Sequence, residues 1–90
     1  MKIGLVVGGV SINPQIQRIS SETEFSNAAR QVSVAPTAAA GGRVDRWIDV
    51  GAMPEPIGNA MREAPVGRVV GPLEVPGALA FFQLRHLRLL

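Results

Sequence analysis

The sequence contains no cysteine and a single histidine, His86. Without thiols the chain can form neither a disulfide nor a thiolate nucleophile, and one imidazole argues against the multi-histidine sites that bind transition metals. No nucleophile and base stand in a recognisable pair, and no cluster of metal ligands is present, which disfavours hydrolase chemistry and metal centres. We therefore expect no metal and no cofactor.

Aromatic residues and charge are also scarce. Four aromatic residues serve a chain of 90, so aliphatic side chains must fill most of the core of one small domain. The net charge is only +2, and the arginines are scattered apart from a short basic group of Arg85, His86 and Arg88. A surface that follows a phosphate backbone needs many more cations, so nucleic acid is not an expected partner.

No apolar run approaches the ~20 residues that span a bilayer, so we expect no membrane insertion. Met1 and Lys2 followed by the apolar residues Ile3–Val7 look like the start of a signal peptide. Gly8 and Gly9 interrupt that run, and no convincing cleavage pattern follows. A short first strand is the preferred interpretation.

The C-terminal quarter has the pattern of a β-hairpin. Two runs rich in β-branched and aromatic residues, Arg68–Val75 and Ala78–Leu84, flank Pro76 and Gly77, a pair typical of tight turns. Both faces of the second run are apolar, with Leu79 and Phe81 alternating with Ala80, Phe82 and Leu84. This pattern predicts the most buried strand of the domain, covered on both sides.

Two amphipathic helices are predicted upstream. The first runs from Ser21, a capping residue, to Val32, and the second starts at Met53-Pro54-Glu55-Pro56 and ends before Pro65. Their apolar stripes have the spacing i, i+3, i+4, i+7, and consist of Phe25, Ala28, Ala29 and Val32, and of Ile57, Ala60, Met61 and Ala64.

Shorter elements complete the prediction. A brief helical turn is expected over residues 13–19, a loop over residues 34–42, and a short strand over residues 43–50 with Trp47 in the core. The fold class is therefore α+β, a small antiparallel-rich sheet with helices packed on it and a C-terminal β-hairpin.

Four segments occur in an order that is familiar from one family. Residues 24–30 with Ser33 are similar to a helix motif D-F-x-x-L-A-x-x-x-S. Gly41 and Gly42, followed by Trp47, are similar to the motif G-G-D-L-G-W. The other two are MPEPI at residues 53–57 and VGRVVGPL at residues 66–73, which is like x-G-x-V-S-x-P-V. In this order the chain resembles the parvulin-type peptidyl-prolyl isomerases, particularly the parvulin modules of SurA-like periplasmic chaperones.

The resemblance implies a single parvulin-like (PpiC or rotamase-type) domain over residues 1–90, shortened at its N-terminal end. Its activity would be rotation of the peptide bond before proline, whose barrier of ~18–20 kcal/mol comes from amide resonance. The resemblance also implies an apolar pocket for the proline ring, formed by Val44, Met53, Ile57 and Leu79. Ordinary core packing is the alternative interpretation of Val44 and Ile57.

The departures from the family concern its polar site residues. The position of a family histidine is occupied by Ala80, and that of a cysteine or aspartate by Ala35. The other family histidine, in a first strand H-I-L, has no counterpart in Ile3–Val7. His86 lies six residues beyond Ala80, roughly 20 Å along a strand, and is expected on the surface. We therefore assign no catalytic residue.

Three hypotheses remain. The domain binds proline-containing or extended segments of unfolded proteins in a chaperone-type role, with weak or lost isomerase activity. It is still a working isomerase, because site groups in such enzymes act by positioning rather than by bond-making. Or it is a structural or assembly element of a longer SurA-like chaperone, completed by a second copy as a homodimer or by the parent chain. The periplasmic location is implied by the resemblance alone.

Overall fold

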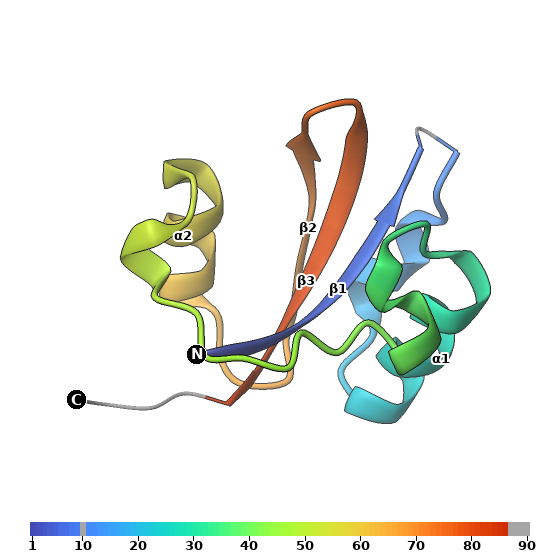
Figure 1. The fold of residues 1–90 in the computed structure, drawn as a ribbon, viewed down its shortest axis with the longest axis horizontal. Coiled ribbons are helices and arrows are strands. Elements are labelled where there is room, and N and C mark those ends of the chain that lie inside the picture. Colours follow the sequence, from blue (N-terminus) through green and yellow to red (C-terminus); the bar gives the residue numbers. More distant parts are fainter. Residues whose placement is uncertain (10, 87–90) are drawn as a thin grey trace.

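The computed structural model describes residues 1–9 and 11–86, which form a three-stranded antiparallel sheet with helices on both faces. The strands are β1 (Lys2–Gly8), β2 (Val69–Val75) and β3 (Ala78–His86). Their order is β1-β3-β2, so the last strand lies in the middle of the sheet (Figure 1). The predicted hairpin and its central, doubly covered strand are confirmed.

Two α-helices, α1 (Glu22–Val32) and α2 (Glu55–Glu63), agree with the two predicted from their apolar stripes. The Ser21 hydroxyl accepts a hydrogen bond from the Glu24 amide at 3.1 Å, which caps the start of α1. Three 3₁₀ helices, Pro14–Arg18, Pro36–Ala40 and Val50–Ala52, complete the set. No helix within the described residues is long and apolar enough to cross a membrane.

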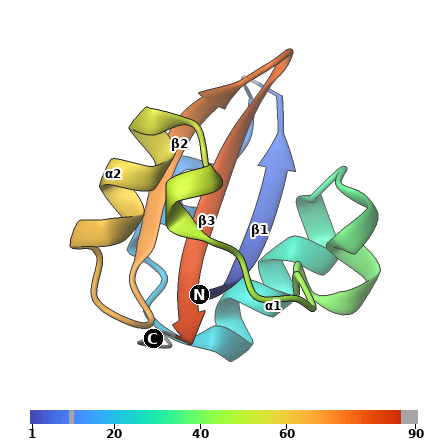
Figure 2. The same ribbon diagram turned by 60° about the vertical axis from the view of Figure 1, so that its left-hand side comes forward.

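The two helices cover opposite faces of the sheet, because successive side chains of a strand point to opposite sides (Figures 1 and 2). On the α1 face the buried cluster consists of Val6, Ile16, Phe25, Ala29, Val69 and Phe81. On the α2 face it consists of Met1, Ile3, Ile57, Met61, Ala80, Phe82 and Leu84. The sheet is therefore shared by two cores, and β3 contributes to both.

The segment over residues 43–50 is not the strand that was predicted. It contacts the sheet through one isolated bridge between Gly4 and Arg43. The Val44 amide also donates to the Ile3 carbonyl of β1 at 3.2 Å, and the Ile48 amide donates to the Met1 carbonyl just before β1 at 2.8 Å. Val44 and Ile48 thereby take the inward positions. Trp47 is left 40% exposed, so its predicted place in the core is wrong.

The loop predicted over residues 34–42 contains the 3₁₀ helix Pro36–Ala40 and closes the outer edge of β1. The Val34 amide donates to the Val7 carbonyl at 2.9 Å, and the Leu5 amide donates to the Gly42 carbonyl at 2.8 Å. Gly42 has φ = 77°, and a Cβ built on it would lie 2.4 Å from the Leu5 carbonyl oxygen. Only glycine fits this contact without displacing backbone.

We therefore expect Gly42→Ala to lower the free energy of unfolding by about 2 to 4 kcal/mol, since it combines a left-handed backbone with a backbone collision. Urea unfolding followed by circular dichroism measures the change. Gly9→Ala is the matched control, because a Cβ at Gly9 meets nothing within 4 Å. Equal unfolding midpoints for the two variants would contradict this account of the edge.

Candidate functional site

The structure brings three of the four predicted proline-pocket residues together. Ile57 belongs to the buried cluster on the α2 face, and Val44 and Met53 are half-buried and pack against it. Val44 comes from the segment beside β1, Met53 from the turn before α2, and Ile57 from the first turn of α2. The site is therefore assembled from segments that adjoin β1 and β3 on one side of the sheet.

The fourth residue, Leu79, lies on the other face. It is paired with Gly8 and Glu74, in the register that puts Phe81 and Val6 on the α1 side. The expectation that Leu79 shares a pocket with Met53 is wrong. The β3 side chains in the cluster on the α2 face are Ala80, Phe82 and Leu84. Because strand side chains alternate, the residue next to Leu79 and not Leu79 itself faces Met53.

The positions that the family resemblance assigns to polar groups meet around Val7. Ala80 is the cross-strand partner of Val7. On the other side of Val7, the Ser33 hydroxyl accepts hydrogen bonds from the amides of Val7 and Ala35, at 3.1 and 3.3 Å. Ala80 and Ala35 are thus held close to one point on β1. Neither offers a side-chain hydrogen bond, and Ala80 is 0% exposed.

The rest of this face is apolar as well. Side chains that pack into or against the cluster come from all three strands: Ile3, Leu5 and Val7 of β1, Val70, Leu73 and Val75 of β2, on either side of a register shift, and Ala80, Phe82 and Leu84 of β3. Several of them are only half-buried. Across these described strand positions, the α2 face offers hydrophobic surface and no acid, base or nucleophile.

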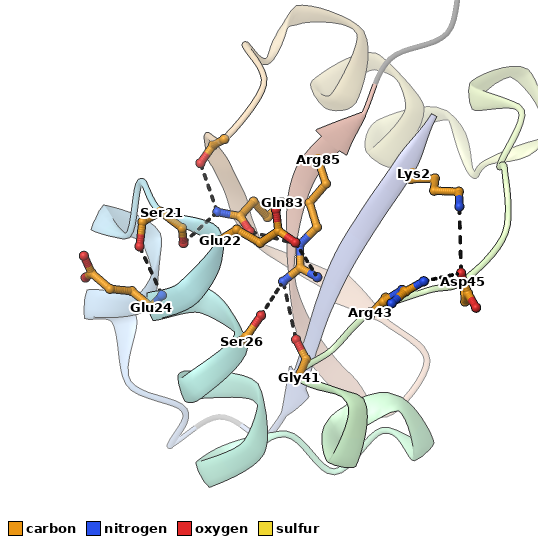
Figure 3. Close-up of polar contacts among 11 residues, drawn as sticks. Lys2, Ser21, Glu22, Glu24, Ser26, Gly41, Arg43, Asp45, Gln83 and Arg85 are labelled. Carbon is orange, nitrogen blue, oxygen red and sulfur yellow. Dashed lines mark hydrogen bonds and ion pairs between the residues drawn. The ribbon is translucent and has the colours of Figure 1, made fainter.

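The α1 face, by contrast, holds a buried polar network that the sequence analysis missed (Figure 3). Gln83 is 0% exposed and donates through Nε2 to the carbonyls of Ser21 and Gly67, both at 3.1 Å. Its Oε1 accepts from Arg85 Nε at 3.2 Å. The side chain therefore joins the start of α1, the approach to β2 and the end of β3.

Arg85 is 8% exposed and is not part of a surface basic group, and Arg88 lies outside the described residues. The Arg85 Nη2 atom donates to the Ser26 hydroxyl at 3.0 Å and to the Gly41 carbonyl at 3.4 Å. Burial lowers the pKa of the guanidinium, and the carboxylate of Glu22, 3.9 Å from Nη1, acts in the opposite direction. Its hydrogen bonds keep this buried cation compensated.

The register of β1 and β3 explains how Arg85 is aimed. Ile3 pairs with Leu84 and Lys2 with His86, so Arg85 is the extra residue of a β-bulge. Gly4 leaves room for the guanidinium, since a Cβ there would lie 2.9 Å from two of its atoms. A bulge and a distant glycine are not visible as a pattern in the sequence around residue 85.

A surface cavity of about 410 Å³ opens at the start of β1, next to the apolar cluster. It touches that cluster at Ile3 and Val44, and not at Met53 or Ile57. Its remaining lining residues are charged, imidazole or aromatic: Lys2, Glu22, Arg43, Trp47, Arg85 and His86. His86 is exposed, as predicted.

The sequence and the fold were compared with those of known proteins. The sequence model of the rotamase family, described as the PPIC-type PPIase domain, matches residues 11–86. A search of curated proteins found no match. Among solved structures, a crystal structure of a PpiC-type peptidyl-prolyl cis-trans isomerase domain superimposes with a TM-score of 0.66 at 24% sequence identity. The superposition covers 92% of this chain and 85% of that one.

Proposed function

Because the chain belongs to the PPIC-type peptidyl-prolyl isomerase (parvulin) family, we propose that it binds proline-containing or extended segments of unfolded proteins, with weak or lost isomerase activity. The observation that carries the proposal is the chemistry of the α2 face. Half-buried Val44 and Met53 offer apolar contacts there, whereas the family's polar positions beside Val7 are alanines.

Apolar contacts explain binding without efficient catalysis. Removing a proline ring and its neighbours from water is favourable in proportion to the apolar area buried. Rotation of the amide also requires stabilisation of a state in which resonance is lost, which preorganised polar groups supply. With Ala80 and Ala35 at the family's polar positions, this domain binds the substrate and gives little such stabilisation.

The same surface suits a chaperone-type role. Half-buried aliphatic side chains from β1, β2 and the segment before α2 extend around the cluster and can contact several residues of an extended chain. Such contacts are tolerant of sequence, as a binder of unfolded proteins requires.

The binding site is tested by titrating a ¹⁵N-labelled domain with a short Ala-Pro peptide. We expect saturable amide shifts at Val44, Met53 and Ile57. Met53→Glu should weaken binding about tenfold or more, since it places a charge where an apolar side chain is buried by the ligand. Val66→Glu is the matched control, because Val66 is exposed and lies outside both clusters.

Catalysis is measured in the same samples by exchange spectroscopy of the peptide's cis and trans signals. We expect exchange close to the uncatalysed time of tens to hundreds of seconds. No saturable shift at millimolar peptide would overturn the binding site. Acceleration by several orders of magnitude would instead establish a working isomerase that needs no imidazole.

A further inference from the structure

The charged cavity at the start of β1 has no part in proline binding as proposed above. We propose that it is a subsite for an acidic side chain, a glutamate or aspartate, carried by the same polypeptide segment whose proline lies on the α2 face. The inference rests on the proposed function for the position of that proline, and the charge preference of the cavity is tested separately below.

The cavity carries more positive than negative charge. Lys2, Arg43 and Arg85 line it together with the exposed imidazole of His86, whereas Glu22 is the single carboxylate in its lining. Within the described residues, the three hydrogen bonds of the Arg85 guanidinium come from Nε and Nη2. Its Nη1 atom forms the 3.9 Å ion pair with Glu22. A carboxylate in the cavity would therefore lie near cations of β1, of β3 and of the segment after Gly42.

Asp45, which is outside the cavity lining, shows how a carboxylate can pair with two of these cations. One of its oxygens, Oδ1, lies 2.9 Å from Arg43 Nη2 and 3.8 Å from Lys2 Nζ (Figure 3). The hydrogen bond and charge of Arg43, followed by the charge of Lys2, lower the pKa of Asp45 below its ordinary 3.8, so it stays ionised at neutral pH. The Arg43–Asp45 pair is exposed to solvent and Lys2 is half-buried. An exposed ion pair is weak enough to be exchanged for a ligand carboxylate.

The cavity borders the apolar site at the start of β1, while Glu22 and Arg85 in its lining belong to the α1 face. Ile3 and Val44 belong to its lining and also to the hydrophobic packing on the α2 face. Trp47 also lines the cavity, and the centroid of its ring lies 5.4 Å from Lys2 Nζ. An extended chain advances roughly 3.3 Å per residue, so a ligand with its proline near Val44 reaches the cations within a few residues.

The test is a series of peptides that contain one proline and a single glutamate, placed one to four residues from the proline on either side. Each has a partner with glutamine in place of glutamate. Binding is followed by Trp47 fluorescence and by amide shifts of Arg43 and Val44. In at least one register the glutamate peptide should bind about fivefold more tightly than its partner, and 0.5 M salt should remove the difference.

Variants identify the cations responsible. Arg43→Gln should reduce the preference to less than about twofold without changing the affinity of the glutamine peptide, and Asp45→Asn should increase the preference by removing the competing carboxylate. Arg18→Gln is the control, since it removes the same charge from an exposed residue outside the cavity lining.

The outcomes separate the two proposals. If no register favours glutamate, or if the preference survives Arg43→Gln, the subsite is overturned even though proline peptides bind. The other combination has two parts. Proline peptides leave the amide signals of Met53 and Ile57 unshifted, and a proline-free peptide with two glutamates shifts the Arg43 amide in the parent but causes no shift in Arg43→Gln. In that case the acidic subsite is supported and the proposed function fails.

Discussion

Replacing Gln83 with leucine should lower the free energy of unfolding by about 3 to 5 kcal/mol. The side chain is fully buried and makes three hydrogen bonds, to the Ser21 and Gly67 carbonyls and from Arg85 Nε. Leucine satisfies none of them, which leaves two carbonyl groups and part of a buried cation without their partners. A domain of this size has only about 5 to 15 kcal/mol of stability, so the variant should be close to unfolding.

Urea unfolding followed by circular dichroism measures the loss, with Gln31→Leu as control on the exposed end of α1. The double variant Gln83→Leu/Arg85→Met tests the network itself. If the two side chains act together, the double variant should lose at least about 1 kcal/mol less than the sum of the single losses. Additive losses, or a Gln83→Leu variant as stable as the control, would show that the contacts contribute little.

The second large effect concerns the position where the family has a histidine. Ala80→His should destabilise the domain by about 2 to 4 kcal/mol, because an imidazole must enter a cluster that already buries Ala80 completely. We also expect no gain in isomerisation rate, since Ala35 and the α2-facing side chains of β1 remain apolar. We therefore do not expect a single substitution to restore the polar site of the family.

Unfolding measurements and cis-trans exchange on the same peptide check both parts of this prediction. Ala78→His is the control, on the same face of β3 but half-buried beside the turn. The prediction fails if Ala80→His is as stable as the parent and its imidazole titrates near the ordinary pKa of about 6.5. A rate increase of about tenfold or more would show that a vacant catalytic position had been refilled.

Much of the fold follows from local chemistry in the sequence. Pro76-Gly77 between two β-prone runs predicts the hairpin, and the serine cap at Ser21 with its apolar stripe predicts α1 nearly to the residue. The family indicated by four motifs in order is confirmed, as is the α+β class. These features depend on residues close together in the chain.

The errors all depend on contacts between distant segments. Leu79 was placed in the pocket although the register of β3 turns it to the α1 face. Trp47 is exposed because Val44 and Ile48 take the positions facing the sheet. Arg85 is buried because a bulge and Gly4 make room for it. None of these arrangements leaves a signal within a few residues of the side chain concerned.

The closed edge of β1 has a consequence for the proposed binding of polypeptides. The amide of Leu5 and the carbonyls of Ile3 and Val7 already bond to the chain between residues 34 and 44, so an incoming chain cannot extend the sheet there. At the other edge, Pro72 lacks a donor in the middle of β2. A polypeptide bound as proposed would rely on side-chain contacts, which do not force one chain direction, so we expect such ligands to lie in either direction across the α2 face.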